Sequence, residues 1–306
     1  MTLSEDLRTE LAAIAPKRGC CRLAELSALF HSAGSVHLLG RGQVALHLDL
    51  STSAVARRAF SLLRELAIDS EIRTYRRRSF DRATRYQLHV DGDKRALAAF
   101  AEAGVLDSRH APVERPPKRV VGRACCRGAY LRGSLLGGGS LSGPRGPHLE
   151  LRTTSLEGAE FLRRVAAADD VRLGVLDRGP HAVAYAKGLD AIEAVLTAAG
   201  AGDTVLAFEE RSVVAAARAE ANRLTNADHA NLVRTSRAAQ AQLEALRSLQ
   251  AAGRLDHLPE RLTEVARLRL RHPTLPLREL AELCEPPSTK ASVYRRLRKL
   301  RELAHP

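Results

Sequence analysis

The sequence of 306 residues is poor in aromatic side chains and contains no tryptophan. Aromatic residues make up only 4% of the chain, which argues against a stacking platform for single-stranded nucleic acid. Apolar runs are short, and no stretch approaches the roughly 18 apolar residues that a membrane-spanning helix needs. The N-terminal segment has acidic residues early, Glu5 and Asp6, and lacks the apolar core of a secretory signal. We therefore expect no membrane partner and a cytoplasmic location.

Cysteine is scarce as well. Four of the five cysteines form two adjacent pairs, Cys20–Cys21 and Cys125–Cys126, and the fifth is Cys284. Adjacent cysteines make strained disulfides and poor metal clamps, and the sequence has no CxxC or spaced Cys/His set of the zinc kind. We therefore expect reduced thiols with a structural role, no metal site and no cofactor. No Ser/His/Asp or Cys/His arrangement of a nucleophilic enzyme can be assembled from the sequence beyond chance either.

Positive charge is abundant. The formal net charge is +13 and the isoelectric point is near 10.2, which favours a polyanionic partner, most commonly nucleic acid. With 45% hydrophobic residues the chain can bury a substantial core. Its length allows roughly two or three domains.

The segment Thr274–Leu303 has the pattern of two short helices with a tight break. In its first half, four apolar residues recur at helical spacing on one face, and Glu285, Pro286 and Pro287 then end the helix. Ser288 or Thr289 can cap the second helix. The apolar faces of the two helices comprise Leu277, Leu280, Ala281 and Cys284, and then Val293, Leu297, Leu300 and Leu303. The preceding residues 258–272 predict a third helix that closes a small core.

The second of these helices is basic on its outer side. Between Thr289 and Leu303, six basic residues stand against Glu302 alone. A basic helix braced by a shorter one is typical of a helix-turn-helix, whose second helix enters the major groove of DNA. The simpler alternative is a solvated basic face on a helix hairpin, since the break lacks the usual turn glycine.

On the first interpretation, the DNA-binding candidates divide by their position on the helix. The residues expected to face the groove are Lys290, Tyr294, Arg295 and Arg298. Those expected nearer phosphate are Arg296, Lys299 and Arg301, and the candidates that complete the set at the start of the helix are Ser288, Thr289 and Ser292.

An internal repeat organises the first two thirds of the chain. CCRLAELSALFHSAGSV from Cys20 aligns without a gap with CCRGAYLRGSLLGGGSL from Cys125, at an offset of 105 residues. Both copies place small residues about one turn apart, which lets two helices approach closely. These residues are Ala28, Ser32 and Ser35 in the first copy and Gly133, Gly137 and Ser140 in the second.

Each copy is followed by the same series of predicted elements, so that each half reads as helix, strands, helix, strands, helix. The expected strands of the first half are a hairpin around Gly40–Gly42 and segments 71–78 and 84–90; its helices follow at 52–67 and 94–103. In the second half, we expect strands at 148–153, 171–177 and 181–187 and helices at 156–168 and 189–199. A short helix at 3–14 precedes them.

The connecting segments set the domain boundaries. Residues 107–122 contain three prolines and predict a linker. The glycine run 137–139 lacks the Gly-Lys-Ser/Thr ending of a phosphate loop and is expected to be a flexible turn. Beyond Gly200 we expect one or two long helices, interrupted near 225–228. The predicted divisions are residues 1–110, 111–205, 206–255 and 256–306.

The repeat resembles the LAGLIDADG motif of homing endonucleases, which residues 24–35 and 129–140 match. The whole chain resembles more closely the WhiA family of bacterial sporulation and cell-division regulators, through RGAYLRGSLL at 127–136, NRLTNADHANL at 222–232 and EPPSTKASVYRRLRKL at 285–300. This resemblance implies an α+β fold: a duplicated LAGLIDADG-like αββαββα body followed by an all-α helix-turn-helix domain. It also implies a regulator that acts on promoters, including those of sporulation or division genes.

The motif lacks the acids that cleavage requires. In the endonucleases its eighth position is an acidic residue that holds the metal, whereas here those positions are Ala33 and Gly138. Neither can bind the Mg²⁺ that stabilises charge on the attacking and leaving oxygens. His31 and Leu136, two positions earlier, cannot replace a carboxylate pair, and the nearby Glu25 has no acidic counterpart. We therefore expect a scaffold that is not an enzyme.

The body has a second basic segment, residues 73–85. Basic strands are the means by which these endonucleases track phosphates, so the segment offers secondary DNA contacts through Arg73, Arg76, Arg77, Arg78, Arg82 and Arg85. The alternative is solvated arginine on an edge strand.

The combined prediction is a sequence-specific transcriptional regulator of sporulation, cell division and chromosome segregation. It binds double-stranded DNA at the nucleoid and carries a catalytically dead scaffold. The alternative is a protein-interaction adaptor, with a sigma factor or RNA polymerase as its partner, in which DNA binding is secondary.

Overall fold

The computed structural model describes residues 2–40, 43–76, 83–143 and 146–304. The chain divides into two compact units, Met1–Ala215 and Ala216–Pro306, each with its own core. Within the described ranges, no helix is both long and apolar enough to cross a membrane.

The N-terminal unit repeats one arrangement twice, as the sequence predicts. The first half contains α1 (Leu3–Ala12), α2 (Gly19–Ala33), β1 (Gly34–Gly40), β2 (Gln43–Leu50), α3 (Ser53–Glu65), β3 (Glu71–Arg76), β4 (Thr84–Asp91) and α4 (Lys94–Glu102). A 3₁₀ turn, η1 (Lys118–Val121), precedes the second half, which contains α5 (Ala124–Gly138), β5 (Gly139–Ser142), β6 (His148–Thr153), α6 (Leu156–Ala167), β7 (Gly174–Asp177), β8 (Ala182–Lys187) and α7 (Leu189–Ala199).

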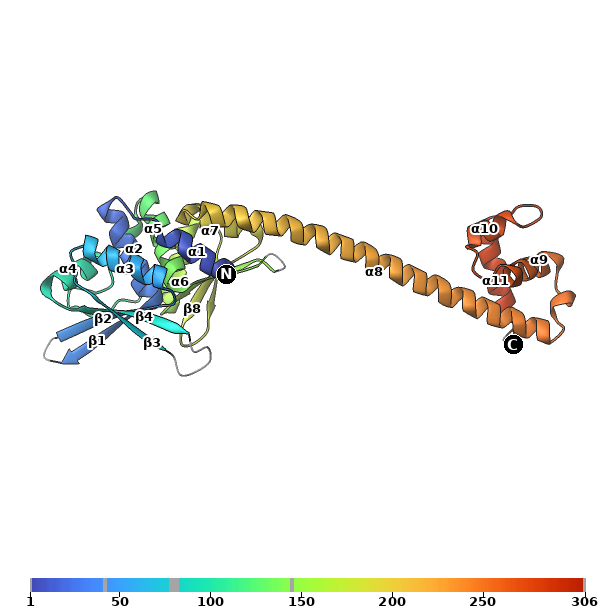
Figure 1. Cartoon of the computed structure of the whole chain (residues 1–306), viewed down its shortest axis with the longest axis horizontal. Coiled ribbons are helices and arrows are strands. Elements are labelled where there is room, and N and C mark those ends of the chain that lie inside the picture. The colour runs from blue at the N-terminus through green and yellow to red at the C-terminus, as the bar shows by residue number, and fades with distance from the viewer. Residues whose placement is uncertain (1, 41–42, 77–82, 144–145, 305–306) are drawn as a thin grey trace. The chain divides into compact units, whose positions relative to one another are not determined.

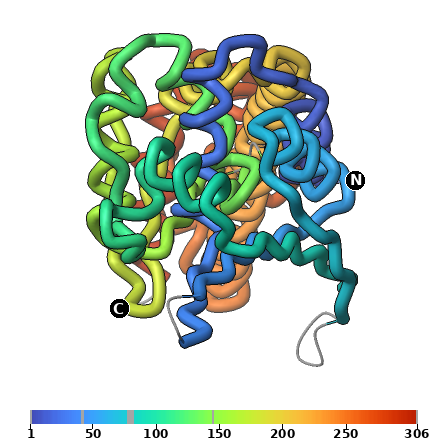
Figure 2. The backbone as a smooth tube through the Cα atoms, turned by 90° about the vertical axis from the view of Figure 1, so that its left-hand side faces the viewer, coloured from blue at the N-terminus to red at the C-terminus, as the bar shows by residue number. Residues whose placement is uncertain are grey.

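Each half builds a four-stranded antiparallel sheet of the same topology. The strand orders are β1-β2-β4-β3 and β5-β6-β8-β7. Helices lie over one face of these sheets (Figure 1), and the two halves lie side by side in the end-on view of Figure 2. The equivalent helices α3 and α6 begin alike, because Thr52 and Ser155 each accept a hydrogen bond from a backbone N–H three residues on.

The two repeat helices, α2 and α5, pack against each other through small residues. A Cβ atom added to Gly133 would lie 2.5 Å from the Glu25 carbonyl oxygen and 2.8 Å from the Cβ of Ala28. Gly137 similarly meets Ser32, at 2.9 Å. The predicted close approach of the helices is therefore confirmed at these positions. Ser35 and Ser140 belong instead to β1 and β5, because each helix ends just before them.

The glycine run 137–139 is not the flexible turn that its composition suggests. Gly137 and Gly138 form the last residues of α5, and Gly139 begins β5, a strand that the sequence analysis missed. Packing explains the glycines, since a Cβ at Gly138 would lie 2.8 Å from the Arg152 carbonyl oxygen.

The connector is a single helix, α8 (Gly202–Ala251), without the expected interruption at 225–228. Thr225 hydrogen-bonds through its hydroxyl to the Ala221 carbonyl oxygen at 2.9 Å, so its polar group is satisfied within the helix. Glu10 of α1 caps the start of α8, where its carboxylate accepts hydrogen bonds from the N–H groups of Asp203 and Thr204, both at 2.8 Å.

The C-terminal unit is a small helical fold. The end of α8 is followed by a 3₁₀ turn, η2 (Leu255–His257), and by α9 (Glu260–Arg271), α10 (Leu277–Glu282) and α11 (Lys290–Ala304). The third helix expected at 258–272 is thus present as α9. The buried core combines residues of all four helices with the second turn: Leu246, Leu249, Leu255, Val265, Ala266, Leu280, Ala281, Cys284, Val293, Leu297 and Leu300.

Candidate nucleic-acid interface

The helix α11 is positioned by one apolar stripe. Val293, Leu297 and Leu300 are buried against α9 and α10, as the four- and three-residue spacing predicts. The helix begins at Lys290 and is capped by the preceding Thr289, whose hydroxyl accepts a hydrogen bond from the backbone N–H of Ser292 at 3.2 Å. Of the two possible caps, Thr289 is therefore the one in use.

The opposite side of α11 is exposed and mostly basic. Tyr294 is 53% exposed and stands among cations, so this face offers charge, hydrogen-bond donors and one aromatic ring. The exposed basic residues are Lys290, Arg295, Arg298, Lys299 and Arg301, whereas Ser292 and Ser288 are half-buried. Glu302 partly offsets the charge, at 3.1 Å from Arg298 and 3.9 Å from Lys299.

Arg296 lies apart from the other cations of α11. Its guanidinium is half-buried and lies 3.8 Å from the Glu264 carboxylate on α9. Glu264 also accepts a hydrogen bond from the backbone N–H of Glu285, at 2.6 Å. Arg296 thus helps to hold α11 against α9, and its expected phosphate contact stays a prediction.

The secondary candidates in the N-terminal unit have a different environment. Arg73 on β3 pairs with Glu71 at 2.7 Å, so the positive charge of this strand is locally offset. Arg76 ends β3 and Arg85 lies on β4. Arg77, Arg78 and Arg82 fall outside the described residues. The contact of this segment with DNA stays a prediction.

A row of histidines crosses the first sheet, and the sequence analysis missed it. His47 Nε2 lies 2.7 Å from His89 Nδ1, whose other ring nitrogen lies 3.0 Å from the Asp91 carboxylate. The rings of His37 and His47 lie with their centroids 4.4 Å apart and are tilted by 41° to each other. Burial, together with the neighbouring His37 and His89, lowers the pKa of His47. Each of β1, β2 and β4 contributes one histidine to the row, and the pairing of β2 with β4, which places His47 opposite His89, is decided by the fold.

The C-terminal ends of α2 and α5 are where the motif positions Ala33 and Gly138 lie, as expected. The acidic residue nearest in sequence, Glu25, is fully buried and bound by two arginines. Its carboxylate accepts hydrogen bonds from Arg58 at 2.9 Å and from Arg132 at 2.7 Å. This carboxylate therefore joins the two halves and is not free to hold a metal.

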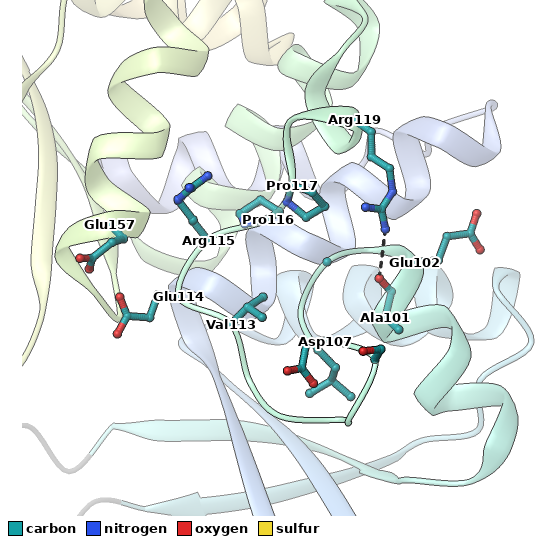
Figure 3. A pocket seen from close by; sticks show the side chains of 13 residues that line it. Ala101, Glu102, Asp107, Val113, Glu114, Arg115, Pro116, Pro117, Arg119 and Glu157 are labelled. Atoms are coloured by element: carbon teal, nitrogen blue, oxygen red, sulfur yellow. Dashed lines mark hydrogen bonds between the residues drawn. The ribbon is translucent and has the colours of Figure 1, made fainter.

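A hollow of about 850 Å³ lies where the linker passes α4 and α6 (Figure 3). In it, Glu114 and Glu157 lie side by side, and their shared hydrogen bond raises the pKa of Glu114. Arg119 hydrogen-bonds to the Ala101 carbonyl oxygen at 3.4 Å. Among the described residues, the acids of this hollow do not form a group of three or more that one ion could bind.

The two adjacent cysteine pairs, expected only to be reduced structural thiols, come together in the structure. The four Sγ atoms of Cys20, Cys21, Cys125 and Cys126 all lie within 4.8 Å of one another. All four are free thiols. Each pair occupies the same position in its copy of the repeat, and this equivalence is the signal in the sequence that the pairs would meet.

Three family models match successive parts of the chain. Residues 19–102 match the WhiA N-terminal LAGLIDADG-like domain, residues 127–218 match the WhiA LAGLIDADG-like domain, and residues 221–304 match the WhiA C-terminal HTH domain.

Curated relatives match along nearly the full length. The chain is 35% identical to a probable cell division protein WhiA of Heliobacterium modesticaldum, over 99% of this chain and 96% of that protein. It is 39% identical to the protein of that name from Acidothermus cellulolyticus, with coverage of 99% and 94%. For the Frankia alni protein of that name the identity is 40%, with coverage of 99% and 93%.

Solved structures support the fold. The crystal structure of full-length WhiA from Thermotoga maritima matches with a TM-score of 0.58 and 23% identity, over 99% of this chain and 98% of that chain. The N-terminal LAGLIDADG domain of a WhiA protein matches with a TM-score of 0.52 and 19% identity, over 65% of this chain and 90% of that chain. The expected α+β body with two antiparallel sheets, followed by a helix-turn-helix domain, is thus confirmed.

Proposed function

This chain belongs to the WhiA family, and from that membership we propose that it is a sequence-specific DNA-binding regulator of transcription. Its relatives are named as probable cell division proteins, and the proposal extends to genes of sporulation, cell division and chromosome segregation. The proposed partner is double-stranded DNA, and the proposed location is the nucleoid.

The observation that carries this proposal is the exposed face of α11. A capped helix is braced by a shorter one and presents five exposed cations around Tyr294, which suits a helix lying in the major groove. Arg295 and Arg298 can each bind guanine through two hydrogen bonds, and Lys299 and Arg301 can contact phosphate.

The test begins with selection of a preferred duplex by the full-length protein, followed by titrations of that duplex and of a scrambled one. Replacing Arg298 with alanine should weaken binding to the preferred duplex by about 1–3 kcal/mol if the side chain reads a guanine. If it contacts phosphate, both duplexes should be bound more weakly and the salt slope should fall by about 1. The same experiment applies to Arg295→Ala.

The matched control is Arg267→Ala on α9. The Arg267 side chain is 66% exposed and pairs with Asp256, much as Arg298 is 64% exposed and pairs with Glu302. Equal binding by wild type, Arg295→Ala and Arg298→Ala would remove these two arginines from the interface and contradict the proposal.

The adaptor remains a second candidate. Leu38 and Leu39 of β1 are 74% and 62% exposed, and two adjacent exposed leucines suit a protein contact such as one with a sigma factor or RNA polymerase. The adaptor predicts that residues 216–306, which have their own core, select no duplex and bind DNA no better than a basic peptide of equal charge.

A further inference from the structure

We propose that Cys20, Cys21, Cys125 and Cys126 bind one divalent metal ion, zinc by the chemistry of its ligands, between the N-terminal ends of α2 and α5. Four thiols in one sphere supply the full ligand set of a closed structural zinc site. Tetrahedral coordination by four sulfurs also excludes the hard cations magnesium and calcium.

The spacing of the sulfurs fits such a site. Tetrahedral zinc with Zn–S bonds of about 2.3 Å places its sulfurs about 3.8 Å apart. Here the Sγ atoms of Cys125 and Cys126 are 4.0 Å apart, and all four lie within 4.8 Å of one another. Side-chain rotations that draw the sulfurs in by less than about 1 Å therefore complete the sphere. A disulfide would use only two of the four.

The position follows from the duplication. Cys20 and Cys125 are each the second residue of their helix, and α2 and α5 pack together, so each adjacent pair meets its repeat counterpart. The other ends of these helices, about 20 Å away along 15-residue helices, carry Ala33 and Gly138. The cysteine site is therefore separate from the place where the endonuclease motif holds its metal.

Positive charge lies beside the cluster, while burial raises the pKa of the Cys21 and Cys126 thiols. Arg18 donates a hydrogen bond from its guanidinium to Cys125 Sγ at 3.7 Å. The first turns of α2 and α5 place their partial positive charge at the cluster, and neither helix receives a side-chain cap. Cys20 and Cys125 are half-buried, whereas Cys21 and Cys126 are buried, so an ion can enter from the side of the first two.

The consequence is a cross-link between the two halves of the N-terminal unit. Two ligands come from each half, so the ion binds the folded arrangement and not either half alone. An ion that binds the folded form stabilises it by mass action.

The experiment uses the reduced, chelator-treated full-length protein. Titration with cobalt(II) should give a d–d absorption band in the red part of the spectrum, as tetrahedral thiolate coordination does. The band should saturate at one cobalt ion per chain and disappear when zinc is added. Zinc should raise the Tm of the N-terminal unit. The double variant Cys20→Ser/Cys125→Ser, which changes the two half-buried ligands, should lose both the band and the zinc-dependent rise in Tm.

Cys284→Ala is the control, because Cys284 is buried in the C-terminal unit and should leave the cobalt band unchanged. Circular dichroism of the double variant establishes that it is folded; if it is not, the single variants replace it. Wild-type protein with all thiols reduced and no cobalt band at one equivalent would overturn the proposal. So would a band that the folded double variant retains.

Discussion

At the centre of the N-terminal unit, the Glu25 carboxylate is fully buried between Arg58 of α3 and Arg132 of α5. Removing a buried carboxylate leaves its partners charged without compensation, which costs more than the pair itself contributes. Glu25 is the one described residue of the repeat helices whose side chain accepts hydrogen bonds from arginines of both halves.

Replacing Glu25 with alanine should lower the free energy of unfolding by about 3–5 kcal/mol, because Arg132 would remain buried without a counter-charge and Arg58 would keep only Glu65, at 3.5 Å. Urea unfolding of the full-length protein measures the effect. Glu160→Ala is the control, since Glu160 pairs with Arg163 on the surface of α6 and should cost less than about 1 kcal/mol. Similar losses of unfolding free energy for both variants would show that the buried Glu25 carboxylate contributes no more than a surface ion pair.

The histidine row predicts a pH dependence. Burial and the nearby His37 and His89 lower the pKa of His47 in the folded protein. At a pH between this lowered pKa and the ordinary value of 6.5, His47 binds a proton in the unfolded chain but not in the folded chain. The contribution of His47 to stability should therefore be complete above pH 6.5 and decline as the pH falls below it. NMR titration of labelled histidine should find the His47 pKa below 6.5, and His89→Ala should raise it. His148→Ala, on the second sheet, should leave it unchanged.

Among the elements, the crossing of α2 and α5 depends on backbone proximity. Gly133 lies so close to α2 that a methyl group would overlap the Glu25 carbonyl oxygen and the Ala28 side chain. The two helices would have to separate, and this separation would disturb the packing of both halves.

We expect Gly133→Ala to destabilise the protein by about 1–3 kcal/mol, although alanine is the better helix former. The control is Gly202→Ala at the start of α8, where no atom lies within 4 Å of the new methyl group. That substitution should change stability by about 0.5 kcal/mol or less. Thermal unfolding compares the two, and a neutral Gly133→Ala would mean that the helix crossing has room to relax.

For the whole molecule, the two units divide the proposed work. In the C-terminal unit, five exposed cations lie on the one helix α11, whereas in the N-terminal unit Arg73 pairs with Glu71 and Glu25 pairs with two arginines. The ends of its repeat helices carry Ala33 and Gly138, which have no group that binds Mg²⁺. On this view the N-terminal unit is a scaffold for the unit that contacts DNA.

Purified full-length protein should therefore leave supercoiled plasmid intact in the presence of Mg²⁺ or Mn²⁺, at concentrations where it binds the plasmid. Gel analysis of nicked and linear forms is the measurement, and Ala33→Asp gives a comparison in which one acid is restored. Metal-dependent nicking by the wild type would contradict the scaffold interpretation.

The sequence alone determined the elements and their repetition. Apolar spacing, caps and proline breaks act within a few residues, so they predicted α7, α9 and α11, the two sheets and the buried stripe of α11. Composition misled at Gly137–Gly139, which are required by close contacts and not by a turn, and at 225–228, where α8 continues without a break.

Tertiary structure alone decided which side chains meet. Glu25 with Arg132, Arg296 with Glu264, and the two cysteine pairs join residues that are distant in the sequence. Local periodicity gives the face of a helix on which a residue lies, but its partner depends on how whole helices and sheets pack, which no short window of sequence contains.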